Sequence, residues 1–145
     1  VASMRVPTPH AVAFAWHSDA LAGVYGDEAA MHPDTPQCGW FKRKLVKGGI
    51  YVAARIWLFS ETDIGTGELL DDEIYQCEVD GQRADPFEQW SYLASNPITE
   101  AEFNYMTALR EHAVRHEPDH PMSNPRKAVD WLRAPLPIFN RSETP

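Results

Sequence analysis

The clearest pattern in the chain is an alternation of side chains between residues 50 and 59. In an extended strand, successive side chains point to opposite faces, so residues two apart share a face. One face of the expected strand is apolar and consists of Ile50, Val52, Ala54, Ile56 and Leu58. The other consists of Tyr51, Ala53, Arg55 and Trp57, which is unusually aromatic for a face in contact with solvent.

Turn signals on both sides of this strand predict its neighbours. Residues 40–46 combine bulky apolar with basic side chains and are expected to form a strand, and Lys47-Gly48-Gly49 supplies a turn into the strand at 50–59. Residues 74–79 are a third strand, and Asp80-Gly81 is a typical two-residue hairpin turn into a short fourth strand at 82–84. The pattern predicts a small, mostly antiparallel four-stranded β-meander.

Three or four helices are expected around this sheet. A short helix is predicted from Pro9 to Leu21, and Asp85-Pro86 and Thr99 are typical N-terminal caps of two further helices, the second over 100–116. Phe103, Met106, Leu109 and Ala113 give that helix an apolar stripe. A last short helix is expected from Asn124-Pro125 through Val129 and Leu132. We therefore predict an α+β fold with the helices packed on one face of the sheet.

The domain organisation follows from these elements. Residues 1–3 have the character of a cloning scar ahead of Met4, and residues 4–39 are expected to form an N-terminal helix and loop arm. Residues 40–139 form the α+β core domain, and residues 140–145 a polar tail. A chain of 145 residues with 43% apolar residues is of the usual size and composition for one globular domain.

Composition narrows the expected location. Two cysteines are too few for a disulfide scaffold, and no apolar run approaches the roughly 18 residues of a membrane span. We expect a cytoplasmic protein with no membrane association. Oligomeric state is left open by the sequence.

Charge is divided along the chain, although the net charge is −8 overall. Residues 40–57 contain five cations and no acid. Residues 61–88 contain ten acids and one arginine, a net charge of −9. Such a division is satisfied either by pairing within the protein or by a partner surface.

The basic segment carries the first candidate site. Its cations and interleaved aromatic residues are Lys42, Arg43, Lys44, Lys47 and Arg55 with Tyr51 and Trp57. These residue types suit a protein interface, and they also suit a sheet that binds single-stranded nucleic acid by stacking and by phosphate contacts. Alternatively, the aromatic residues are core and the cations pair with the acidic strand that follows.

The acidic segment carries the second candidate, an interface for another protein. Its members are Glu61, Asp63, Glu68, Asp71, Asp72 and Glu73. Calcium binding is a weaker hypothesis, because the ligand spacing of an EF-hand is absent.

A third candidate is a histidine cluster. His112 and His116 are four residues apart on one helix face, and His120 follows in the next loop, so the three are a candidate zinc site of a small metal-dependent enzyme. An exposed helix end explains the same residues, since imidazoles are favoured there by the helix dipole. Neither an HExxH motif nor paired CxxC motifs support the metal hypothesis, and we predict no cofactor.

Several segments together resemble a known family. They are PQCGWFKRKLVKGG at 36–49, VAARIW at 52–57, CEVDG at 77–81, ADP at 84–86 and NPITEAEF at 96–103. In these segments the chain resembles a family of small uncharacterised proteins encoded in phages and prophages of proteobacteria. The resemblance spans roughly residues 30–139 and implies a phage-associated accessory protein of the bacterial cytoplasm, with no catalytic residues assigned.

Glycine-rich phosphate loops, nucleophile elbows and dinucleotide fingerprints are all missing from the sequence. We therefore expect a non-enzymatic module that uses its divided surface charge to bind a host or phage protein. The two alternatives are single-stranded nucleic-acid binding through residues 40–57 and a metal-dependent enzyme built on His112, His116 and His120.

Overall fold

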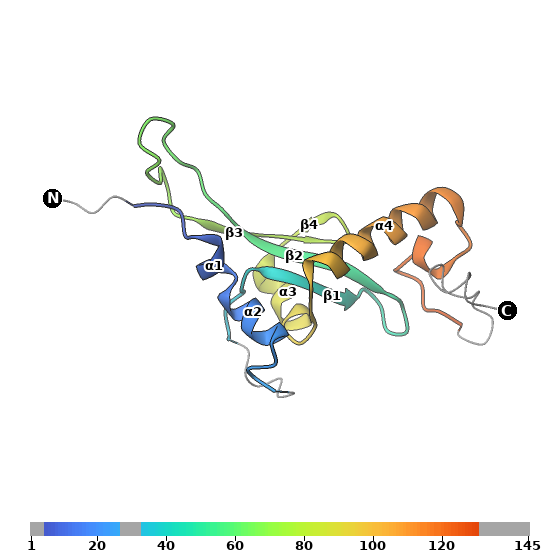
Figure 1. The fold of residues 1–145 in the computed structure, drawn as a ribbon. Helices are drawn as coiled ribbons and strands as arrows, with labels where there is room; N and C mark the ends of the chain where they lie inside the picture. The colour runs from blue at the N-terminus through green and yellow to red at the C-terminus, as the bar shows by residue number, and fades with distance from the viewer. Residues whose placement is uncertain (1–4, 27–32, 131–145) are drawn as a thin grey trace.

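The computed structural model describes residues 5–26 and 33–130 of the chain, and these form an α+β fold (Figure 1). Its sheet is open, antiparallel and five-stranded. The strands are β1 (Gly39–Lys44), β2 (Tyr51–Phe59), β3 (Ile74–Val79), β4 (Gln82–Ala84) and β5 (Pro97–Ile98). The α-helices in the described residues are α1 (His10–Ala13), α2 (Ala15–Leu21), α3 (Pro86–Leu93) and α4 (Glu100–His116).

The sheet has the strand order β4-β3-β2-β1-β5, so its first four strands form the expected meander. The sequence pattern missed the fifth strand, in which Ile98 pairs with Trp40 and Pro97 with Phe41. Two residues between two helices are too few to show an alternation. The position also suits a proline, because an edge strand has a side on which no backbone donor is needed.

The predicted Asp80-Gly81 turn is present between β3 and β4. Both residues have positive φ angles, 53° and 75°, which match the right-handed twist of the strands they join. The Asp80 carboxylate accepts two hydrogen bonds from Arg110 of α4, at 3.1 and 3.2 Å. Arg110 also donates to the carbonyls of Met122 and Ser123, so one guanidinium joins the turn, α4 and the chain that follows it.

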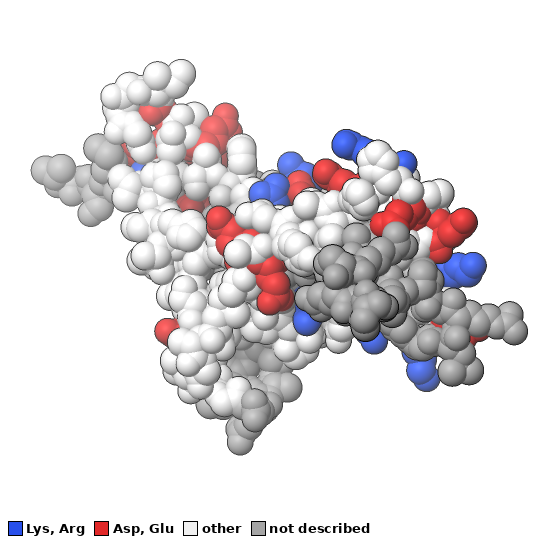
Figure 2. All heavy atoms as spheres, turned by 45° about the vertical axis from the view of Figure 1, so that its right-hand side comes forward, with Lys and Arg blue, Asp and Glu red and all other residues white. Residues whose placement is uncertain are grey.

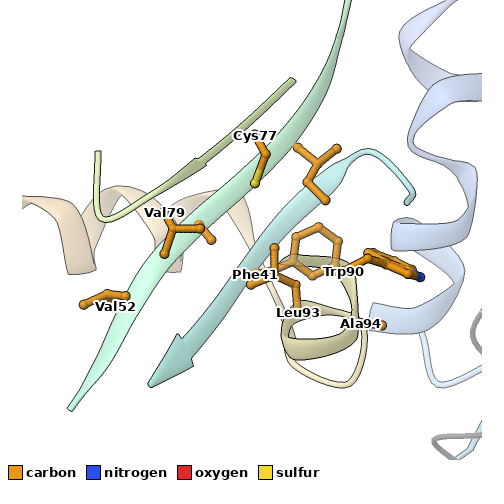
Figure 3. Packing of buried hydrophobic residues seen from close by; sticks show 9 residues of the cluster. Phe41, Val52, Cys77, Val79, Trp90, Leu93 and Ala94 are labelled. Carbon is orange, nitrogen blue, oxygen red and sulfur yellow. The ribbon is translucent and has the colours of Figure 1, made fainter. Parts of the chain in front are cut away.

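One face of the sheet, here called the core face, is covered by α3 and α2. Its buried cluster consists of Phe41, Val52, Ala54, Ile56 and Cys77 with Val79, Trp90, Leu93 and Ala94 (Figure 3). The Phe41 and Trp90 rings meet edge to face at 5.6 Å, and Phe41 has no exposed surface. Burying each large side chain contributes about 1.5–3 kcal/mol, so this cluster is the main source of stability.

Helix α3 begins where the sequence predicts. The Asp85 side chain accepts a hydrogen bond from the backbone N–H of Phe87 at 2.9 Å, and Pro86 occupies the first turn, where no backbone donor is required. Trp90 and Leu93 are the buried residues of this helix. The indole of Trp90 donates to the carbonyl of Pro33 at 2.7 Å, which fixes the segment leading into β1.

Helix α4 lies on the opposite face of the sheet, which corrects the expectation that all helices pack on one face (Figure 1). Its N-cap, Thr99, accepts from the N–H of Glu102 at 3.0 Å, as predicted. Phe103 and Met106 lie beside Ala53 of β2, which is 9% exposed. The second face of β2, which is unusually aromatic for a solvent face, is therefore partly covered by α4.

The helix predicted from Pro9 to Leu21 is divided at Phe14 into α1 and α2. These helices straddle one edge of the sheet: the Phe14 ring lies 5.0 Å from Trp40, whereas Trp16 lies 6.5 Å from Phe41 on the core face. Buried His17 fixes the junction, because its Nε2 lies 3.0 Å from the carbonyl of Trp40 and 2.8 Å from that of Ile98.

The helix predicted from Asn124 is wrong over its described part. A 3₁₀ turn, η2 (Pro121–Ser123), comes first, and residues 124–130 contain no helix; Leu132 lies outside the described residues. The Asn124 side chain accepts from the N–H of Arg126, and Val129 donates to the carbonyl of Gly48. The Val129 donor is thus given to the β1–β2 turn and not to the carbonyl four residues earlier, as a helix would require. Residues 1–3 and 140–145 also lie outside the described part.

Candidate protein-binding surface

The face of the sheet opposite the core, here called the open face, is incompletely covered. Strand register places Trp40, Lys42, Lys44, Tyr51, Ala53, Arg55, Trp57, Phe59, Ile74, Gln76, Glu78 and Arg83 on it. Helix α4 crosses the middle of this face, over Ala53. Beyond the helix, the cross-strand pair Phe59 and Ile74 is exposed, at 49% and 55%.

The centre of the uncovered part is Trp57, with two arginines near its ring. The guanidinium of Arg55 lies 4.3 Å from the Trp57 ring, and that of Arg83 lies 5.4 Å from it. Arg55 also pairs with Glu78 at 3.3 Å. The surface called the Trp57 strip consists of Trp57, Arg55, Arg83, Glu78, Phe59, Ile74 and Gln76. Cation–π contacts of this kind hold the arginine side chains near the ring.

A cleft adjoins the Trp57 strip where α4 lies over β2 and β3. Its volume is about 280 Å³, and its lining is mainly apolar, with Ala53, Phe103 and Met106 among its residues. Arg55 and Glu78 line it as well, so the cleft and the strip form one continuous surface. A cleft of this size accepts one or two side chains of a partner.

Residues 59–74 form a hairpin that extends beyond the sheet and its helices (Figure 1), here called the projecting hairpin. At its tip Asp63 accepts hydrogen bonds from the N–H groups of Gly65 and Thr66, at 2.8 and 3.0 Å, and these bonds lower the pKa of its carboxyl. Ile64, next to them, is fully exposed. The turn is therefore ordered by its own hydrogen bonds and presents an apolar side chain to solvent.

The N-terminal segment fastens the projecting hairpin. Leu69 donates its backbone N–H to the carbonyl of Arg5 at 2.7 Å, and the Arg5 side chain pairs with Asp72 at 2.7 Å. Glu73 accepts from the N–H and hydroxyl of Thr8 and from the hydroxyl of Ser60. These bonds, that of the Thr8 hydroxyl first, lower the pKa of the Glu73 carboxyl.

The predicted acidic residues accordingly have two different roles. Asp63, Asp72 and Glu73 build and fasten the projecting hairpin, although Asp72 is also largely exposed. Glu61, Glu68 and Asp71 are exposed along it. Figure 2 shows acidic atoms on this projecting end of the molecule, at the upper left, whereas basic atoms gather at the opposite end, with further acidic atoms among them.

The predicted basic residues do not form one surface. Lys42 and Lys44 lie over the Tyr51 ring on the open face, at 4.7 and 5.1 Å. Arg43 points to the other face, because strand neighbours alternate; there it donates to Gln89 at 2.6 Å and lies 4.0 Å from the Tyr92 ring. Lys47 is exposed in the β1–β2 turn. Arg55 and Trp57 belong to the Trp57 strip.

The two charged segments do not neutralise each other. Within residues 5–26 and 33–130, Arg55 with Glu78 is the one ion pair between the basic segment 40–57 and the acidic segment 61–88. The reason is their placement: β2 begins at the basic β1–β2 turn and ends at the projecting hairpin. The acids of residues 61–73 therefore lie at one end of the fold and the cations of the β1–β2 turn at the other, whereas Glu78, Asp80, Asp85 and Glu88 lie outside the hairpin.

The histidine cluster is only partly assembled. The rings of His112 and His116 lie 5.0 Å apart on α4, and His112 pairs with Glu117 at 3.5 Å. His120 is buried, and its Nδ1 accepts a hydrogen bond from the N–H of Met122. In the described part of the chain, no group of three His, Cys, Asp or Glu residues is placed to hold a metal ion.

Cys38 and Cys77 are buried free thiols. Burial raises the pKa of each to about 11, with a smaller contribution from Glu73 at Cys38 and from Glu78 at Cys77. Nucleophilic cysteines require the opposite shift, because the thiolate is the reactive form. Both residues therefore act as small core side chains.

Sequence reasoning missed Arg83 as a member of the site. Register could have found it: the Asp80-Gly81 turn pairs Arg83 with Glu78, which pairs in turn with Arg55. His17 left no such signal, because the carbonyls it contacts belong to residues 23 and 81 positions away.

Comparison with known protein families, with curated proteins and with solved structures finds no match. The resemblance to phage- and prophage-encoded proteins therefore stays a prediction. Among the described residues, no helix has the length and apolar character needed to cross a membrane.

Proposed function

We propose that this protein is a non-enzymatic binding module that recognises another protein through the open face of its sheet. The observation that carries this proposal is the Trp57 strip, in which two guanidiniums contact one indole beside exposed Phe59 and Ile74. Tryptophan, other aromatic residues and arginine are the residue types enriched at protein interfaces and at their energetic hot spots.

The surroundings of the strip support the same proposal. The adjoining cleft of about 280 Å³ is a pocket for an anchoring side chain of the partner. The unneutralised acidic hairpin supplies a field that steers and orients a partner of complementary charge. By the resemblance described above, that partner is a host or phage protein in the bacterial cytoplasm.

Binding of single-stranded nucleic acid is less well supported. A stacking sheet needs cations that follow the phosphates along the same surface. Here Arg43 lies on the core face, Arg55 is paired with Glu78, and the strip leads directly into the acidic hairpin. A polyanion would be attracted by the strip and repelled by the hairpin.

Site-specific photo-crosslinking tests the proposed function. A benzophenone amino acid placed at Gln76, within the Trp57 strip, is expected to give covalent protein adducts in bacterial cells. The matched control is the same amino acid at exposed Ser91 of α3. Adducts should form at position 76 but not at 91, and Trp57→Ala should reduce them.

Equal adducts at the two positions, or none at position 76, would contradict the proposal. Nucleic-acid adducts at position 76 would instead support the nucleic-acid alternative. In that case labelled single strands should bind the purified protein with a steep salt dependence.

A further inference from the structure

We propose that the partner of the open face is a second copy of this chain, bound through a two-fold axis. This inference rests on the proposed function and names the partner of the same surface. In the arrangement, the projecting hairpin of each copy lies across the Trp57 strip of the other.

Charge complementarity is the first argument. The strip presents the guanidiniums of Arg55 and Arg83, and Glu78 is the acid paired there. The hairpin presents exposed acids such as Glu61 and Glu68. Among the described residues, the cation that pairs with an acid of the hairpin is Arg5, which contacts Asp72. An acidic surface and an arginine surface are thus both exposed on one molecule, and each is the counterpart that the other lacks.

The order of the two surfaces along the same strands is the second argument. Trp57 and Ile64 are seven residues apart, about 23 Å in extended chain. Consider a two-fold axis that lies in the plane of the interface, runs perpendicular to the strands and passes midway between Trp57 and Ile64. This axis places the hairpin tip of each copy over the Trp57 strip of the other. Such an interface is self-complementary and closed, so it gives a dimer and not a filament.

Exposed apolar side chains fit the same axis. Phe59 and Ile74 lie between the Trp57 strip's centre and the hairpin tip, and about half of each is exposed. In the two-fold arrangement this pair meets its own counterpart near the axis. Ile64 and Leu70 of the hairpin, also exposed, are carried toward the other copy's Trp57. The dimer therefore buries the apolar groups that one chain leaves in water.

A charge-swap experiment tests the dimer. Wild-type protein at low salt is expected to sediment as a dimer at high concentration, and added salt should weaken its association. Arg83→Glu and Glu68→Lys should each weaken association about tenfold or more, because each brings like charges together. Mixed with one another, the two variants should associate again, since both contacts of the mixed dimer join opposite charges.

Two exposed charges outside this surface provide matched controls. Arg115→Glu on α4 and Asp19→Lys on α2 make the same charge changes and should leave association unchanged. Circular dichroism and thermal unfolding of each variant exclude misfolding as the cause of a loss.

The proposal is overturned if the wild-type chain stays monomeric at every concentration and salt, or if the mixed variants do not associate. A monomeric chain that still crosslinks a different protein from position 76 refutes the dimer and leaves the proposed function standing. Failure of both experiments refutes both.

Discussion

The two faces of the sheet are built from the same strands but are completed in different ways. On the core face, α3 and α2 cover Phe41, Ile56 and Cys77 until almost no surface remains accessible. On the open face, α4 covers Ala53 and leaves Phe59 and Ile74 about half exposed. The core face is therefore fully covered by helices of the same chain, whereas the open face is covered only in part.

The comparison teaches that alternation alone does not show which face of a strand is the core. Both faces of β2 carry large apolar or aromatic side chains. The two faces differ in their neighbours, because arginine side chains lie near the aromatic ring on the open face. Ile56 is packed among apolar side chains, whereas the guanidiniums of Arg55 and Arg83 lie near the Trp57 ring. We therefore expect Trp57 to contribute less to folding than Phe41 does.

The largest difference between the faces is expected from truncating one ring on each. Phe41→Ala should lower the free energy of unfolding by about 3–5 kcal/mol, because it leaves a cavity in a fully buried site. Trp57→Ala, measured by urea denaturation under the same conditions at high salt, should cost clearly less, about 1–2 kcal/mol, because the indole is only partly buried. Similar losses for the two variants would show that the open face is also core.

The edge where α2 meets the sheet offers a smaller effect. A Cβ at Gly39 would lie 2.5 Å from Cδ2 of His17, so Gly39→Ala should destabilise the protein by about 1–3 kcal/mol. In a His17→Ala background the same substitution should cost much less, because the ring is gone. A loss of equal size in both backgrounds would mean that the clash is not its cause.

His17 also gives the core face a dependence on pH. Burial lowers the pKa of its imidazole below the usual 6.5, and its hydrogen bonds to the carbonyls of Ile98 and Trp40 oppose this only in part. The unfolded chain then takes up the proton first, so stability is fully present above pH 6.5 and is lost as the pH falls toward the folded-state pKa. Urea denaturation from pH 8 to pH 5 should show this decrease, and His17→Gln should remove it. A profile unchanged by His17→Gln would contradict the assignment.

The smallest effect on stability is expected at the tip of the projecting hairpin. Ile64→Ser should change the free energy of unfolding by no more than about 0.5 kcal/mol, because the Ile64 side chain is fully exposed to water in the folded protein and loses no contacts. In sedimentation the same variant should self-associate more weakly than the wild-type chain. Unchanged self-association of a stable variant would show that the hairpin tip is not part of the interface.

The sequence was sufficient for features that depend on near neighbours. The α+β class with an antiparallel sheet, the Asp80-Gly81 turn and the caps at Asp85 and Thr99 all follow from local spacing and are confirmed, whereas the sheet has five strands and not the expected four. The two-residue strand β5 and the position of α4 on the open face depend on distant pairing, which local patterns do not contain. The helix expected from Asn124 is absent over its described part, where Val129 donates to Gly48 of the β1–β2 turn and not to the carbonyl four residues earlier.

The candidate site shows the same limit. Tyr51, Arg55 and Trp57 were expected to share a face, and strand register confirms that they do. The placement of Arg43 on the opposite face followed from the same alternation and was overlooked. Arg83 required the register of two hairpins, and the anchoring of the acidic hairpin by Arg5 and Thr8 joins residues more than sixty positions apart.

The most direct test of the central claim compares stability and binding in one variant, Trp57→Ala. We predict that its free energy of unfolding stays within about 2 kcal/mol of the wild-type value while crosslinking from position 76 falls several-fold. A large loss of stability, with crosslinking unchanged, would show that Trp57 serves the fold and that the open face is not an interface.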